Sequence, residues 1–159
     1  MSIISKTVAP EPLTLETKRR KLAQVIVCDG CCCGRTEKGR PRIPLERLKS
    51  EWKARKLLGT VQLTISGCLG PCDLANVVGV QTASSNLYLG GLTTDLEYEA
   101  LLEWATRCTQ SQRLEPLPGL LSDRRFEQFR ISESGRISES GLAPEQTIFI
   151  APEGAGGSI

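Results

Sequence analysis

The chain has 159 residues and a formal net charge of +2, which is enough for one ordinary domain with tails and too short for two domains with separate cores. Hydrophobic residues make up 40% of the chain and aromatic residues only 4%, so we expect a largely aliphatic core. The presence of seven cysteines and no histidine excludes mixed Cys/His zinc sites and every mechanism that needs an imidazole base.

The two ends of the chain differ in composition from its middle. Residues 1–21 are polar, contain prolines and end in a basic run, which predicts a flexible basic arm. Residues 22–110 carry the periodic hydrophobic patterns of a single domain. Residues 111–159 contain prolines, glycines and a duplicated hexapeptide at 130–141. Because two copies are too few for a repeat fold, this last segment is predicted to be a mostly disordered tail.

The first half of the predicted domain has the order strand, helix, strand. The β-branched run at 24–27 predicts a buried strand that stops at Cys28. Pro44 is followed by apolar residues at helical spacing, which predicts an amphipathic helix that ends near Gly59. Residues 60–66 predict a second strand. This order implies two parallel strands joined by a right-handed crossover.

The second half of the domain is predicted to be a hairpin followed by a helix. Short apolar runs at 77–80 and 86–89 are separated by a polar turn, which is typical of antiparallel strands. Thr94 can cap a helix whose apolar residues recur every three or four positions up to Cys108, so Cys108 is expected in the core. The predicted fold class is therefore α/β, with about four strands in a mixed sheet and two main helices.

Six of the seven cysteines lie in two loops that directly follow the two strands predicted to be parallel. Loops at the same ends of neighbouring parallel strands emerge at one edge of the sheet, so these cysteines can meet. Each loop can supply a pair of thiolates, and four thiolates suit a metal centre such as an iron-sulfur cluster. The expected ligands are Cys28, Cys33, Cys68 and Cys72. Cys31 or Cys32 could replace Cys33 after a small loop shift, and Cys33 is preferred on spacing.

The N-terminus does not resemble a secretory signal, and no hydrophobic stretch reaches membrane-spanning length. We therefore expect a cytoplasmic protein without a membrane partner. In that reducing compartment, clustered cysteines more often bind metal or carry redox chemistry than form structural disulfides.

The cysteine spacing resembles that of a known family. Four residues separate Cys28 from Cys33, and the second loop reads Gly67-Cys68-Leu69-Gly70-Pro71-Cys72. In these features and in the order of strands and helices, residues 22–109 resemble the thioredoxin-like 2Fe-2S ferredoxins and are similar to the small 2Fe-2S subunit of bacterial NADH dehydrogenases. The resemblance implies a thioredoxin-like fold, a 2Fe-2S cluster ligated by the two loops, and one-electron transfer between protein partners. The chain departs from the family pattern in having the second ligand within a run of three cysteines.

Three other functions are kept as alternatives. Four thiolates also suit a structural zinc site, although a gap of three residues between Cys68 and Cys72 is unusual for a zinc knuckle. Residues 28–31 form a C-x-x-C motif after a strand, as in thiol-disulfide oxidoreductases, but this function leaves the cysteines of the second loop without a role. The third alternative is a protein-interaction module that uses the basic helix and the tails.

The positive charge is concentrated in residues 1–60, which carry 14 Lys and Arg against 6 Asp and Glu. This segment lacks a pattern of interleaved aromatic residues that stack on bases, so nucleic acid is not an expected partner. We expect acidic redox proteins to dock at the basic residues of the first cysteine loop, with a homodimer as an open alternative. These residues are Arg35, Lys38, Arg40 and Arg42. The sequence contains no convincing nucleotide, flavin or hydrolytic motif, so independent enzymatic activity is not expected.

Overall fold

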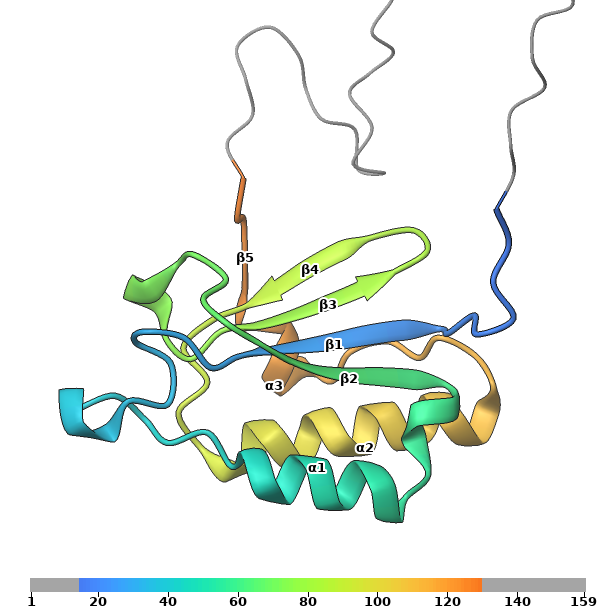
Figure 1. Ribbon diagram of the computed structural model, residues 1–159, viewed down its shortest axis with the longest axis horizontal. Coiled ribbons are helices and arrows are strands. Elements are labelled where there is room, and N and C mark those ends of the chain that lie inside the picture. The colour runs from blue at the N-terminus through green and yellow to red at the C-terminus, as the bar shows by residue number, and fades with distance from the viewer. Residues whose placement is uncertain (1–14, 130–159) are drawn as a thin grey trace, which may run out of the picture.

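The computed structural model describes residues 15–129 of the chain, and its centre is a five-stranded mixed sheet with the strand order β2-β1-β3-β4-β5 (Figure 1). Strands β1 and β2 are parallel, whereas β1/β3, β3/β4 and β4/β5 are antiparallel. The strands are β1 (Ala23–Cys28), β2 (Val61–Ser66), β3 (Val78–Thr82), β4 (Asn86–Leu89) and β5 (Arg125–Phe126). The helices are α1 (Leu45–Ala54), α2 (Asp95–Ser111) and α3 (Gly119–Ser122), with single 3₁₀ turns at Thr36–Lys38, Leu57–Gly59 and Cys72–Leu74.

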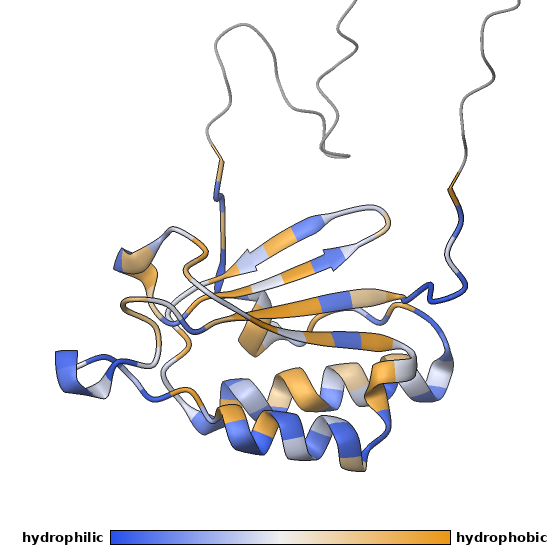
Figure 2. Cartoon of the chain, viewed as in Figure 1, coloured by the Kyte–Doolittle hydropathy of each residue, from blue (hydrophilic) through white to orange (hydrophobic). Residues whose placement is uncertain are grey.

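The two long helices lie side by side on one face of the sheet (Figure 1). Strand β1 buries alternate residues, Ala23, Val25 and Val27, as expected for a strand with one covered face. In α1, Trp52 is almost fully buried and donates a hydrogen bond from its indole nitrogen to the Val61 carbonyl oxygen at 2.8 Å. Figure 2 shows apolar segments along the central strands and the long helices, with polar positions between them. The core therefore lies between the sheet and these helices.

This arrangement confirms the predicted α/β fold with a mixed sheet and the order of its first four strands and two main helices. The predicted cap of the last helix is also present, because Thr94 and Glu97 form a reciprocal capping box at the start of α2. Cys108 lies in the core with no exposed surface, as its position on the apolar side of the helix predicted. No helix within residues 15–129 is long and apolar enough to cross a membrane.

The folded part continues past residue 110, where the sequence predicted a tail to begin. Leu121 of α3 is fully buried, and β5 adds a fifth strand by pairing Phe126 with Tyr88. These two elements are four and two residues long, too short for hydrophobic periodicity to reveal them. Residues 15–21 of the predicted arm are exposed and form neither helix nor strand. The duplicated hexapeptide lies outside the described residues.

The C-terminal segment is held to the domain by an ion pair with a buried carboxylate. Glu97 is fully buried and accepts hydrogen bonds from the backbone amides of Thr93 and Thr94 at 2.7 and 2.9 Å. Arg124, just before β5, donates to the other carboxylate oxygen at 2.7 Å. Burial alone would raise the pKa of Glu97, but these donors and the guanidinium together hold the pKa below its usual value.

We expect Glu97→Gln to make the stability of the protein less dependent on pH. Because the pKa of Glu97 is lower in the folded chain, its carboxylate stabilises the fold above the ordinary glutamate pKa, and this contribution is lost as pH falls through the folded pKa. The free energy of unfolding of the variant should therefore be lower than that of the wild type at pH 7. This gap in unfolding free energy should close as the pH falls below about 4. Urea unfolding of the reduced protein at several pH values measures this gap. Glu103→Gln, on the exposed side of α2, is the control and should show no such gap.

Candidate metal centre

The two cysteine loops leave the sheet at the same edge because β1 and β2 end in register. Cys28, the last residue of β1, is paired with Ser66, the last residue of β2 and two positions before Cys68. The backbone amide of Cys28 donates to the Val77 carbonyl oxygen at 3.0 Å, and the next amide, that of Asp29, donates to Ser66 at 2.9 Å. The start of the first loop is thus fixed to strands on both sides of β1.

The loops then touch at a glycine. A Cβ atom placed on Gly30 would lie 2.7 Å from the Cα atom and 2.9 Å from the Cβ atom of Cys68, closer than such atoms can approach. Only a residue without a side chain lets the first loop pass this close to the second. Gly30 is therefore a structural requirement for bringing the two sets of cysteines together.

Four of the cysteines form an outer group at the surface: Cys31, Cys32, Cys68 and Cys72. The Cys72 sulfur lies 3.5 Å from the sulfurs of both Cys31 and Cys68, and the sulfurs of Cys31 and Cys32 are 3.9 Å apart. The sulfurs of Cys31, Cys32 and Cys72 all lie within 4.8 Å of one another. Hydrogen bonds with the Cys31 and Cys68 thiols, and then burial, raise the pKa of Cys72. These sulfurs are close enough to bind one metal centre.

Cys28 and Cys33 form an inner pair behind the outer group, with exposed fractions of 3% and 2%. Burial, together with the hydrogen bond with the Cys28 thiol and the nearby Cys28 and Cys68 sulfurs, raises the pKa of Cys33 to about 12. The backbone of Val77 acts in the opposite direction. Metal binding at this pair must therefore displace a firmly held proton.

All six cysteines of the two loops line one narrow cavity, together with Gly70, Pro71 and Val77. The cavity contains the four predicted ligands as two close pairs, Cys28 with Cys33 and Cys68 with Cys72. Both alternative ligands, Cys31 and Cys32, also border it, so the structure does not separate the three candidates for the second ligand by distance. All seven cysteines are free thiols.

The basic residues of the first loop differ in their contacts. The Arg35 guanidinium donates to the Gly30 carbonyl oxygen at 2.9 Å, and the Lys38 ammonium donates to the Cys31 carbonyl oxygen at 2.8 Å. Arg42 lies 4.0 Å from Asp95, and both side chains are exposed. Arg40 is only partly exposed. Arg35 and Lys38 therefore hold the loop that carries the cysteines and also bring positive charge close to it.

Asn76 positions the first cysteine loop, a role that the sequence analysis missed. Its fully buried side chain accepts a hydrogen bond from the Gly34 amide at 2.7 Å, next to Cys33. Its amide nitrogen donates to the carbonyl oxygens of Pro41 and Leu92 at 2.9 and 3.1 Å. One side chain thus holds the loop at two points and ties it to the segment that precedes α2. Its position four residues after Cys72 was the only signal of this role in the sequence.

The C-terminal segment contacts the second cysteine loop. The Gln128 side-chain nitrogen donates to the Leu69 carbonyl oxygen at 3.2 Å and lies 3.1 Å from the position of a Cβ atom on Gly70. Gly70 has a φ of +115°, a conformation that favours glycine, and its amide donates to the Cys68 sulfur at 3.4 Å. The segment predicted as a tail thus contains a residue that supports the candidate site.

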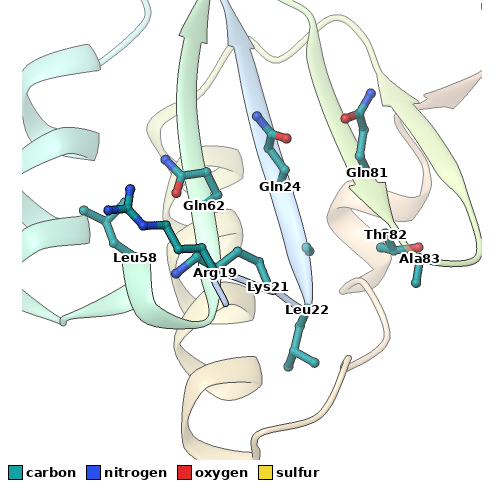
Figure 3. Close-up of a pocket in the computed structure, with 10 residues that line it drawn as sticks. Arg19, Lys21, Leu22, Gln24, Leu58, Gln62, Gln81, Thr82 and Ala83 are labelled. Carbon is teal, nitrogen blue, oxygen red and sulfur yellow. The ribbon is translucent and has the colours of Figure 1, made fainter. Parts of the chain in front are cut away.

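A second cavity lies at the other end of the sheet, where β1 and β2 begin and β3 ends (Figure 3). Gln24, Gln62 and Gln81 project into it from neighbouring strands, and Gln24 is in register with both of the others. Arg19 and Lys21 line it as well. No cysteine lines it, so the cysteine cavity is the stronger candidate for a functional site.

The crystal structure at 1.5 Å resolution of the wild-type thioredoxin-like [2Fe-2S] ferredoxin from Aquifex aeolicus is similar to this chain. The two sequences are 15% identical, the TM-score is 0.38, and the match covers 69% of this chain and 100% of the other. No protein-family model matches the chain, and a search of curated proteins finds no match.

Proposed function

We propose that this protein is a small electron carrier that binds a 2Fe-2S cluster through Cys28, Cys33, Cys68 and Cys72. The observation that carries the proposal is the convergence of six free thiols from two loops on one cavity, with the four proposed ligands in two close pairs. A 2Fe-2S cluster takes four thiolates, two on each iron, which matches one pair from each loop. The spacing of these four cysteines in the sequence supports the same set.

The residues fit such a cluster in chemistry and in support. Thiolates are its usual ligands, and the inner pair lies in apolar surroundings beside Val77. Gly30 and Gly70 keep side chains away from the sulfurs, and the Gly70 amide already donates to the Cys68 sulfur. The cavity is narrow and is lined by the thiols of both loops, so the ligands already lie close to one another.

The cluster would supply one-electron chemistry, and the chain would bind it, shield it and adjust its charge. Cys28 and Cys33 are buried and would hold the cluster from within the core, whereas Cys68 and Cys72 lie nearer the solvent and would provide the shorter path for an electron to a partner. Arg35 and Lys38 place positive charge against a group that four thiolates make negative.

The partners in this proposal are redox proteins with acidic docking surfaces, which would meet the basic first loop at Arg35, Lys38, Arg40 and Arg42. The protein itself would have no independent enzymatic activity and would act in the cytoplasm, where reduced thiols are available for cluster assembly. Docking through surface charges of this kind weakens as salt rises.

The experiment that tests the proposal is anaerobic purification of the full chain. We expect a coloured protein whose visible absorption bleaches with dithionite, and which contains two iron and two acid-labile sulfide per chain. Electron paramagnetic resonance of the reduced protein should show a single unpaired electron spin. A colourless protein that also fails to assemble a cluster with added iron and sulfide would refute the proposal.

A further inference from the structure

The outer cysteines are arranged as ligands for a single metal ion. A zinc ion bound to four thiolates has Zn–S bonds of about 2.3 Å, so its sulfurs lie about 3.8 Å apart at the corners of a tetrahedron. Three edges of the outer group measure 3.5, 3.5 and 3.9 Å, and Cys32 lies within 4.8 Å of Cys72. The sulfurs that all lie within 4.8 Å of one another are those of Cys31, Cys32 and Cys72, and Cys68, 3.5 Å from Cys72, completes a tetrahedron once its side chain turns toward the other two.

We propose that the outer group is a second metal site, which binds one thiophilic divalent ion of the zinc class through Cys31, Cys32, Cys68 and Cys72. Four sulfur donors select soft or borderline ions over magnesium or calcium, which prefer oxygen. Cys31 and Cys68 are exposed, so an ion reaches the sulfurs from solvent without opening the core. The site uses Cys31 and Cys32, two thiols that the proposed cluster leaves free.

The charges around the group favour this ion. A divalent ion with four thiolates carries a net charge of −2, and the thiols release their protons as it binds. The ammonium of Lys38 lies against the Cys31 carbonyl oxygen at 2.8 Å, and Arg35 holds Gly30 in the same loop. Both cations lie where they offset the negative charge of the bound site.

The two metal centres exclude each other because both require Cys68 and Cys72. An ion in the outer site removes half of the ligands that the cluster needs, so the zinc-loaded chain cannot assemble a cluster until the ion is removed. This competition, though not the outer site itself, rests on the proposed function. Through this competition, Cys31 and Cys32 determine which metal the chain carries.

The test is titration of Co²⁺ into the reduced, metal-free full chain, followed by displacement with Zn²⁺. We expect one Co²⁺ per chain with the intense visible absorption of a tetrahedral thiolate site, lost on adding an equal amount of Zn²⁺. The double variant Cys31→Ser/Cys32→Ser should bind Co²⁺ at least ~100-fold more weakly, since even changes beyond the direct ligands cost up to about that much. The matched variant Cys28→Ser/Cys33→Ser should bind Co²⁺ as the wild type does.

The same two variants separate this site from the cluster. With added iron and sulfide, Cys31→Ser/Cys32→Ser should assemble the cluster, and Cys28→Ser/Cys33→Ser should not. If Cys31→Ser/Cys32→Ser binds Co²⁺ as tightly as the wild type, the outer site is refuted and the cluster proposal is untouched. If no variant or wild-type protein assembles a cluster but the Co²⁺ results hold, the proposed function fails and the outer site stands.

Discussion

Replacement of Cys72 by serine is expected to remove all metal binding at the cysteine loops. Cys72 is the central sulfur of the site, 3.5 Å from both Cys31 and Cys68, and both proposed metal centres use it. A serine hydroxyl is a poor ligand for these metals because it does not ionise near neutral pH. The iron content of anaerobically purified Cys72→Ser should therefore fall from two per chain to background, and its Co²⁺ titration should show no tetrahedral thiolate absorption.

The control for this experiment is Cys108→Ser, the same exchange at the one cysteine outside the site. Cys108 is fully buried in α2, and its sulfur accepts a hydrogen bond from the Glu115 amide at 3.3 Å, a contact that a serine oxygen can also make. We expect this variant to keep its full iron content and its visible spectrum. A Cys72→Ser protein that retained the wild-type spectrum would contradict the ligand set, and loss of metal in Cys108→Ser would point to a fold defect instead.

Much of the fold could be predicted from the sequence because its elements obey local rules. The β-branched run before Cys28 and the alternating residues of 60–66 identify two strands, and a helical crossover between them requires a parallel pair. Thr94 and Glu97 stand at the spacing of a capping box, which fixes the start of α2. These local patterns are enough to place the two cysteine loops at one edge of the sheet.

The remaining features depend on contacts between distant segments, which local patterns do not reveal. Strand β5 has only two residues, and it forms because Arg124 reaches the buried Glu97 and Phe126 pairs with Tyr88. Which of three adjacent cysteines is the second ligand depends on how the loop folds. Cys31 is exposed, Cys32 is half-buried and Cys33 is buried, and this difference cannot be read from their positions in the sequence. The close approach of Gly30 to Cys68 is likewise visible only in three dimensions.

Asn76→Ala is expected to destabilise the protein strongly and to loosen the first cysteine loop. The variant loses three side-chain hydrogen bonds and leaves the Gly34 amide and the carbonyl oxygens of Pro41 and Leu92 without these partners. Each unsatisfied buried group costs about 1–3 kcal/mol, so a loss of about 3 kcal/mol or more in unfolding free energy is expected. Urea unfolding of the metal-free, reduced protein measures this loss without any contribution from bound metal.

The loosened loop should also be visible at the site itself. Because Asn76 holds Gly34 and Pro41, hydrogen exchange of the amides in residues 30–42 should become faster than the global loss of stability alone explains. The variant should also lose its cluster sooner after dilution than the wild type does. Asn86→Ala, the same exchange at an exposed position at the start of β4, should change stability by no more than about 0.5 kcal/mol. Equal stabilities for the two variants, with unchanged exchange rates in residues 30–42, would show that Asn76 does not hold the loop.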